Sequence, residues 1–180
     1  NEKGFVSYHQ DAKYIGLEPH NWVTAWVAIT DSNEKNGCMR MWSGSHKDNL
    51  KEHDQKFNEG NLLTRGQTVK NVPKDETTPI VLEAGQISLH HPMVVHGSEP
   101  NKSNDRRIGF VIQSYISTNV NQVLGKNSVQ IARGVDKFNF HEKIGRPNLL
   151  MDKDDLELKK KENDNLQEIF YKGSNKKGSY

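Results

Sequence analysis

The sequence predicts a mainly β domain, a sandwich or jelly roll, and three observations lead to this fold class. Short runs rich in β-branched and aromatic residues recur along the chain up to about residue 118. Within these runs, successive side chains can be assigned to two faces, as a half-buried strand requires. Clusters of Gly, Asn and Ser separate the runs, which is typical of short strands joined by turns. The length of 180 residues suits one domain.

The clearest strand covers residues 21–30, "NWVTAWVAIT". A period of two places alternate side chains of this strand on one face, namely Trp22, Thr24, Trp26 and Ala28. The turn cluster "DSNEKNG", with the hairpin signal Asn36-Gly37, leads into a short strand, "CMRMW", and a second turn, "SGSH". Residues 47–66 are polar and charged, which predicts a long irregular excursion.

Two later stretches also carry strand patterns. "TPIVLEAGQISLHH" predicts two strands that are interrupted at Ala84-Gly85. "RRIGFVIQSYIS" predicts one more strand, with Ile108, Phe110 and Ile112 on one face. Its opposite face would carry Arg107, Gly109, Val111 and Gln113.

The end of the chain has a different composition. "DKDDLELKKKENDNLQEIF" predicts a helix with a solvated, charged face and a few apolar anchors, namely Leu156, Leu166, Ile169 and Phe170. The last residues, "YKGSNKKGSY", are expected to fray. We therefore divide the chain into residues 1–150, the β portion, and residues 151–180, a charged helical and frayed tail of the same domain.

Composition narrows the function classes. The net charge is +2, with acids and bases interleaved, so no nucleic-acid surface is expected. No apolar run approaches 18 residues, and we expect no membrane partner. The single cysteine, Cys38, excludes an internal disulfide framework and fits a cytoplasmic protein. The first residue is Asn1 and not methionine, and a segment rich in polar and ionisable side chains, "SYHQDAKY", begins within the first ten residues. We therefore expect that an N-terminal part is missing.

An H-x-D pair, His9 and Asp11, predicts a metal site. On a strand, residues two apart point the same way, so both side chains could reach one ion. His96, at the end of a distant strand-like run, is the best third ligand. Two histidines and one carboxylate form the facial triad of non-haem Fe(II) oxygenases. The pair by itself is weak evidence, because a histidine in such a tripeptide is more often structural.

Arg107 strengthens the hypothesis. It follows His96 on the next predicted strand, where its planar guanidinium could hold a carboxylate with two hydrogen bonds. An oxygenase that uses 2-oxoglutarate needs such a cation for the C5 carboxylate of that cosubstrate. Arg106 would face the other way on the strand and is interpreted as a surface residue.

Four segments together resemble the phytanoyl-CoA dioxygenase (PhyH) family, and most closely its bacterial members that act on small molecules. They are "HQDAKYIGL", "VTAWVAITDSNEKNGCMRMWSGSH", "AGQISLHHPMVVHGSEPNKSNDRRIGF" and "ARGVD", in family order between about residues 5 and 140. The resemblance implies a double-stranded β-helix, a cupin-like jelly roll that is incomplete at the N-terminus. Residues 1–150 would then be the C-terminal portion of a PhyH-like dioxygenase domain.

The resemblance also implies roles for individual residues. His9, Asp11 and His96 take the metal-ligand positions for Fe(II), and Arg107 takes the position that pairs with 2-oxoglutarate. Three residues match positions that line the cosubstrate pocket, namely Ser98, Trp26 and Gln10. Trp26 has ordinary core packing as an equal alternative, and Gln10 would need a local twist to face the ligands.

The implied reaction is hydroxylation of a small-molecule substrate with O₂ and 2-oxoglutarate, releasing succinate and CO₂. Halogenating relatives have a small residue in place of the carboxylate, so Asp11 favours hydroxylation. Two alternatives stay open: a non-catalytic cupin-like metal- or ligand-binding domain, and an inactive fragment of the dioxygenase. The sequence leaves open the substrate, the oligomeric state, and the roles of His90, His91 and Arg133. Of the two adjacent histidines, we expect neither to bind the metal, and a structural role is favoured over the alternative that one of them lines the substrate side.

Overall fold

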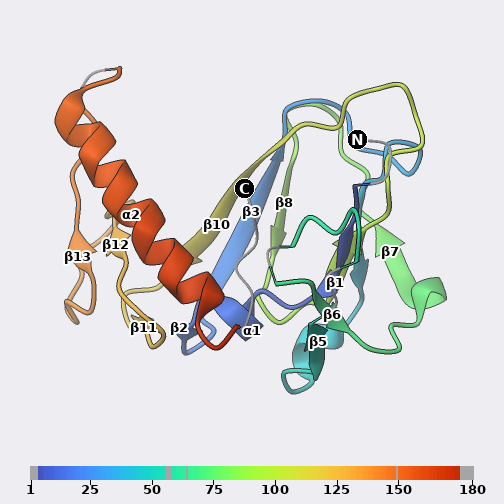
Figure 1. Cartoon of the computed structure of the whole chain (residues 1–180), viewed down its shortest axis with the longest axis horizontal. Helices are drawn as coiled ribbons and strands as arrows, with labels where there is room; N and C mark the ends of the chain where they lie inside the picture. Colours follow the sequence, from blue (N-terminus) through green and yellow to red (C-terminus); the bar gives the residue numbers. More distant parts are fainter. Residues whose placement is uncertain (1–3, 56–57, 64, 149, 175–180) are drawn as a thin grey trace.

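Two antiparallel sheets face each other and form the body of the molecule (Figure 1). The computed structural model describes residues 4–55, 58–63, 65–148 and 150–174. The first sheet has the strand order β1-β9-β4-β7, which are Val6–His9, His96–Ser98, Met39–Trp42 and Thr77–Pro79. The second has the order β10-β3-β8, which are Gly109–Ile116, Trp22–Ala28 and Ile87–His90. Side chains from both sheets line one cavity, and the predicted mainly β jelly roll is confirmed.

Smaller elements connect or flank these sheets. Three two-stranded pairs accompany them: β5 (His53–Gln55) with β6 (Gln67–Val69), β2 (Leu17–Glu18) with β11 (Asn121–Gln122), and β12 (Ser128–Val129) with β13 (Glu142–Lys143). Two short 3₁₀ turns cover Ser45–Lys47 and Lys74–Glu76. The helices are α1 (Ala12–Ile15) and α2 (Lys153–Tyr171). The described helices include none that is both long and apolar enough to cross a membrane.

The predicted strands are found close to their expected positions. Residues 21–30 contain β3, and the two strands of "TPIVLEAGQISLHH" are β7 and β8, separated by a loop with Gly85 at φ 91°. β10 begins at Gly109 rather than at the preceding arginines. Residues 47–66 are less irregular than expected, because β5 pairs with β6 across this region. The alternation argument therefore located most of the sheet residues.

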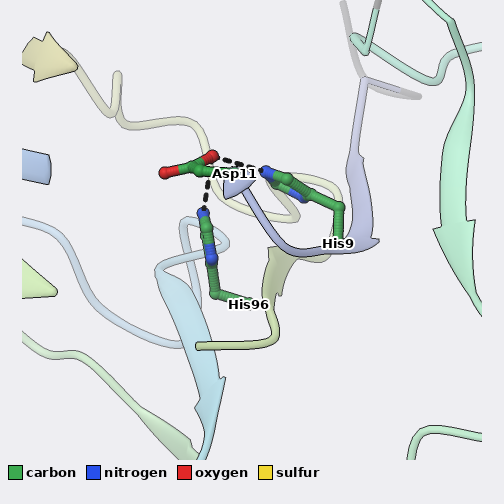
Figure 2. A group of neighbouring side chains, drawn as sticks. All are labelled: His9, Asp11 and His96. Carbon is green, nitrogen blue, oxygen red and sulfur yellow. Dashed lines mark ion pairs between the residues drawn. The ribbon is translucent and has the colours of Figure 1, made fainter. Parts of the chain in front are cut away.

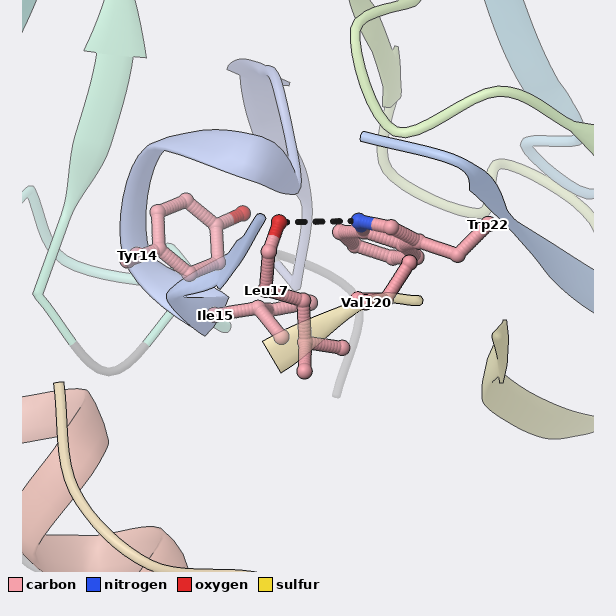
Figure 3. Packing of buried hydrophobic residues seen from close by; sticks show 5 residues of the cluster. All are labelled: Tyr14, Ile15, Leu17, Trp22 and Val120. Atoms are coloured by element: carbon pink, nitrogen blue, oxygen red, sulfur yellow. Dashed lines mark hydrogen bonds between the residues drawn. The ribbon is translucent and has the colours of Figure 1, made fainter. Parts of the chain in front are cut away.

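One hydrophobic cluster joins the start of the chain to its later part (Figure 3). Its buried members come from α1, β2, β3 and the loop before β11: Tyr14, Ile15, Leu17, Trp22 and Val120. The indole N–H of Trp22 donates a hydrogen bond to the carbonyl oxygen of Leu17 over 3.2 Å. Tyr14 and Ile15 belong to α1, which directly follows Asp11, and the ring centre of Tyr14 lies 5.9 Å from that of His9, so this cluster supports the position of the segment that carries both proposed ligands.

α2 confirms the predicted C-terminal helix but changes its anchors. Asp152 caps its start by accepting hydrogen bonds from the backbone N–H groups of Asp154 and Asp155. Ile169 is buried and Phe170 packs against the cluster of Figure 3, as expected. Leu156 and Leu166 are 43% and 37% exposed, so they are not core anchors. The helix lies beside β11, β12 and β13 (Figure 1), and the expected fraying of the last residues falls largely outside the described residues.

Candidate metal and cosubstrate site

His9 and Asp11 come together by a different route from the one expected. β1 ends at His9, and Asp11 has helical backbone angles, φ −57° and ψ −37°, at the start of α1. The two residues therefore do not share a strand, and the geometric argument from strand alternation was wrong. A turn at Gln10 brings the two side chains to the same side instead. Both are buried.

His96 is placed by strand pairing. β1 and β9 run antiparallel, and His9 lies directly opposite His96 in their register. The centroids of the two imidazole rings are 4.3 Å apart. Directly opposed residues of an antiparallel pair have their Cβ atoms ~5 Å apart, close enough for such side chains to meet. The tertiary pairing thus brings the third predicted ligand to the first two.

The three side chains offer donor atoms to a common point (Figure 2). Asp11 Oδ1 lies 3.5 Å from His9 Nε2 and 3.9 Å from His96 Nε2. One ligand atom from each residue lies within 4.8 Å of the others. This set, with two imidazoles and one carboxylate, is the donor set of a facial triad.

The tautomers of both histidines are determined by backbone carbonyl groups. His9 Nδ1 lies 2.7 Å from the carbonyl oxygen of Ser7, and His96 Nδ1 lies 2.9 Å from that of Val94. A carbonyl oxygen only accepts, so each Nδ1 carries a proton, and the neutral form of either ring has its lone pair at Nε2. Asp11 Oδ2 accepts a hydrogen bond from Thr24 Oγ1 over 2.9 Å, which leaves Oδ1 facing the imidazoles. A cation would relieve the repulsion among these three acceptors.

The charge states also suit a metal. Burial lowers the pKa of His96 to about 3, so the ring is neutral at neutral pH. Burial alone would raise the pKa of Asp11, but positive charge held among the surrounding imidazoles lowers that pKa well below its ordinary value. A neutral imidazole and an ionised carboxylate are the forms that bind a divalent ion.

Arg107 lies in the same cavity, which has a volume of about 240 Å³. Its Nη2 is 3.4 Å from Ser98 Oγ, and its guanidinium carbon lies 5.8 Å from the centre of the Trp26 ring. Among the described residues, no carboxylate forms an ion pair with Arg107, although burial disfavours its charge and lowers its pKa. Ser98 and Trp26 also line the cavity, so the structure brings these three predicted residues together. A half-buried guanidinium without an acidic partner is suited to bind an anionic ligand.

Gln10 does not join them. Its side chain is fully buried, is absent from the cavity wall, and makes hydrogen bonds to two backbone groups outside the site. The expectation that Gln10 lines the cosubstrate pocket is therefore corrected. The alternation argument had already indicated that Gln10 points away from the ligands.

His90 is closer to the site than the sequence indicated. Its Nε2 lies 3.8 Å from Asp11 Oδ2, and its ring centre lies 4.7 Å from that of His96. His90 lines the cavity, whereas His91 is placed differently and accepts a hydrogen bond from the backbone N–H of Met93. Neither ring nitrogen of His90 has a hydrogen-bond partner among the described residues. The pairing of His90 opposite Thr24 explains its inward position, and only the strand register could have revealed it.

Comparisons with known proteins agree with this geometry. The family model described as phytanoyl-CoA dioxygenase (PhyH) matches residues 1–109. Peroxisomal phytanoyl-CoA dioxygenase of Mus musculus is 33% identical over 101 residues, which are 55% of this chain and 30% of that protein. A probable alpha-ketoglutarate-dependent hypophosphite dioxygenase of Stutzerimonas stutzeri is 28% identical over 123 residues, 67% of this chain and 42% of that protein. The chain thus spans less than half the length of these relatives.

A solved structure matches a larger part of the chain. The non-heme monooxygenase ThoJ, in its apo form, superposes with a TM-score of 0.81 and 28% identity, over 94% of this chain and 61% of ThoJ. A nickel complex of ThoJ matches with a TM-score of 0.72 and 26% identity, over 93% of this chain and 60% of that one. The family prediction is confirmed by the family model, which covers more than half of the chain. The chain belongs to the phytanoyl-CoA dioxygenase (PhyH) family.

Proposed function

We propose that this protein is an Fe(II)- and 2-oxoglutarate-dependent dioxygenase that hydroxylates a small-molecule substrate and releases succinate and CO₂. One observation carries the proposal: the same cavity contains a buried triad of metal-binding groups and a guanidinium that has no acidic partner within the described part of the chain. A metal-binding domain alone would need the triad but would have no use for Arg107. Family membership supports the same conclusion.

His9, Asp11 and His96 fit Fe(II) and would hold it. Their donor atoms face one another, the Nδ1 contacts of both imidazoles leave Nε2 for the ion, and Thr24 fixes the second oxygen of the carboxylate. Fe(II) with this donor set supplies the activation of O₂ for oxidation of an unactivated carbon. The protein holds the imidazoles through the carbonyl oxygens of Ser7 and Val94, so the rings are oriented before the metal arrives.

Arg107, Ser98 and Trp26 would hold 2-oxoglutarate. The guanidinium offers two parallel N–H donors to the distant carboxylate, and the Ser98 hydroxyl beside it adds a third. Trp26 forms a flat wall beside the guanidinium. This end of the cavity therefore fixes the orientation of the cosubstrate and keeps its keto acid end toward the triad.

The substrate is proposed to be small because the cavity measures about 240 Å³ and the cosubstrate occupies part of it. The carboxylate of Asp11 fills the position that halogenating relatives keep small, so hydroxylation is the expected outcome.

Cys38 is buried and forms no disulfide, which supports a cytoplasmic location where thiols stay reduced.

The test is succinate formation from 2-oxoglutarate in the presence of Fe(II), screened across small metabolites as substrates. The parent protein should release succinate only with Fe(II) present, and His96→Ala should release none. Calorimetry measures the binding of 2-oxoglutarate to the protein loaded with Co(II) in place of Fe(II). This binding separates a dioxygenase from a non-catalytic metal-binding domain. Undiminished succinate formation by His96→Ala, or no binding of 2-oxoglutarate by the parent, would contradict the proposal.

A further inference from the structure

Three segments that are distant in the sequence meet at the side chain of Gln10. Gln10 Nε2 donates a hydrogen bond to the carbonyl oxygen of Met93 over 2.7 Å. Gln10 Oε1 accepts one from the backbone N–H of Lys51 over 2.8 Å. One buried amide therefore connects the turn between His9 and Asp11 to the segment that leads into His96, and to the segment before β5.

A second residue holds the backbone of the same turn. The backbone N–H of Gln10, between the two proposed ligands, donates to His53 Nε2 over 3.0 Å. His53 Nδ1 lies 2.8 Å from the carbonyl oxygen of Lys51, which only accepts, so Nδ1 carries the proton and Nε2 is the acceptor. Burial lowers the pKa of His53 to about 4, which keeps the ring neutral at neutral pH.

We propose that Gln10 and His53 are positioning residues that hold the turn between His9 and Asp11 in the metal-binding geometry, in register with His96. This inference rests on the proposed function, because it concerns the metal of that site. Neither residue contacts the cavity, so each acts through the ligands and not on the substrate or the cosubstrate.

The physical reason lies in the turn itself. Without a cation, two imidazole lone pairs and a carboxylate oxygen face one another and repel, so the turn needs anchors that keep the three groups together. Another long-range hydrogen bond holds the turn at the same place: the backbone N–H of Ala12 donates to the carbonyl oxygen of Pro92 over 3.1 Å, beside the bond from Gln10 to Met93. A site that is held closed binds an ion more tightly, since less conformational freedom is lost on binding.

The experiment measures Co(II) affinity and the visible absorption spectrum of the Co(II) form, which reports ligand geometry independently of turnover. Gln10→Met keeps the approximate size of the side chain and removes both amide hydrogen bonds. We expect its Co(II) affinity to fall by about 10-fold or more, as for other residues that orient metal ligands. The absorption bands should shift, because the ligand positions relax.

His53 provides a second, independent pair of variants. His53→Leu removes the acceptor for the backbone N–H of Gln10, and we expect a similar loss of Co(II) affinity. His53→Gln places an amide oxygen near the position of Nε2 and should restore most of the affinity. A double variant, Gln10→Met with His53→Leu, should lose less affinity than the product of the two single losses, because both act on one turn.

Asn36 provides the matched control. It is a buried amide that also bridges backbone groups: Nδ2 donates to the carbonyl oxygen of Asp31, and Oδ1 accepts from the N–H of Asn33, each over 2.8 Å. Its hairpin carries no proposed ligand. Asn36→Leu should lower the thermal stability of the metal-free protein but leave the Co(II) affinity within about twofold of the parent.

The outcomes separate the two proposals. A parent protein that does not bind Co(II) contradicts the proposed function. A parent that binds Co(II), with Gln10→Met binding equally well, overturns the positioning role alone. An equal loss of affinity in Asn36→Leu would also overturn it, because general destabilisation would then explain the effect. If Gln10→Met does not fold, the contrast between His53→Leu and His53→Gln decides the question.

Discussion

The two faces of the sheet β10-β3-β8 are made from alternate residues of the same strands, yet they differ in chemistry. The inner face contributes Thr24, Trp26 and Gln113 to the cavity. The outer face presents large apolar side chains to solvent: Leu89 is 68% exposed, Phe110 59% and Ile87 54%. On soluble proteins, contiguous apolar surfaces of this kind usually mark contact sites.

The two faces also differ in the contacts that their side chains make. Inner side chains are held by specific hydrogen bonds, such as that from Thr24 to Asp11, so a substitution there should alter the affinity for the metal or the cosubstrate. Outer side chains make few contacts in this chain, so a change there should alter little. Variants on the two faces can therefore test whether the binding chemistry is confined to one side of the sheet.

The largest effect is expected for Asp11→Ala, in the cavity beside the inner face. Changing a residue that only orients a ligand already costs about 10- to 100-fold in metal affinity, so removing a ligand should cost more than about 100-fold. Calorimetric titration of the metal-free protein with Co(II) measures this. Retention of the parental affinity would show that Asp11 is not a ligand.

Arg107→Gln should weaken 2-oxoglutarate binding by about 10- to 100-fold, the equivalent of one hydrogen bond to a charged group. Co(II) affinity should be unchanged, because Arg107 is not part of the triad. Arg107→Lys keeps the charge but loses the two-pronged geometry, so its affinity should fall in between. Calorimetry with the Co(II)-loaded protein compares the three. An equal loss of Co(II) affinity would disprove a specific role with the cosubstrate.

Gly109→Ala tests the packing of the inner face. A Cβ atom at this position would lie 2.1 Å from Trp26 Cζ2, so the indole ring must move. Overpacking of this kind costs about 1–3 kcal/mol in unfolding free energy, and 2-oxoglutarate affinity should fall as well. Gly145→Ala is the control, since a methyl group there would meet no atom within 4 Å beyond its chain neighbours. Equal denaturation midpoints for the two variants would refute the packing argument.

The smallest effect is expected on the outer face. Leu89→Thr keeps a residue suited to a strand and should change the unfolding free energy by no more than about 0.5 kcal/mol. Metal and cosubstrate affinities should match those of the parent. A destabilisation above about 1 kcal/mol in chemical denaturation would instead show that the outer face is covered in solution.

Local patterns predicted much of the fold and of the site. The period of two in residues 21–30 placed Thr24 and Trp26 on one face, and both line the cavity. The same pattern placed Arg107 and Val111 together, and they line it too. Strand alternation is a property of neighbouring residues, so it can be recognised without knowing what the strand packs against.

The geometry of the triad could not be derived in this way. The chain turns at Gln10, whose side chain bonds to Lys51 and Met93 far along the chain, and Asp11 begins a helix. Gln10 was therefore assigned to the wrong environment, and His53 was not singled out. No role was assigned to His90 from the sequence, because only its register opposite Thr24 reveals that it faces Asp11.

The sequence by itself determined which residues this protein offers for chemistry: His9, Asp11, His96 and Arg107. The tertiary structure decided that the first three meet and that Arg107 lies in the same cavity. The reason is physical. Donor identity and strand periodicity are local properties, whereas a metal site requires distances between residues that only strand pairing and buried hydrogen bonds can set.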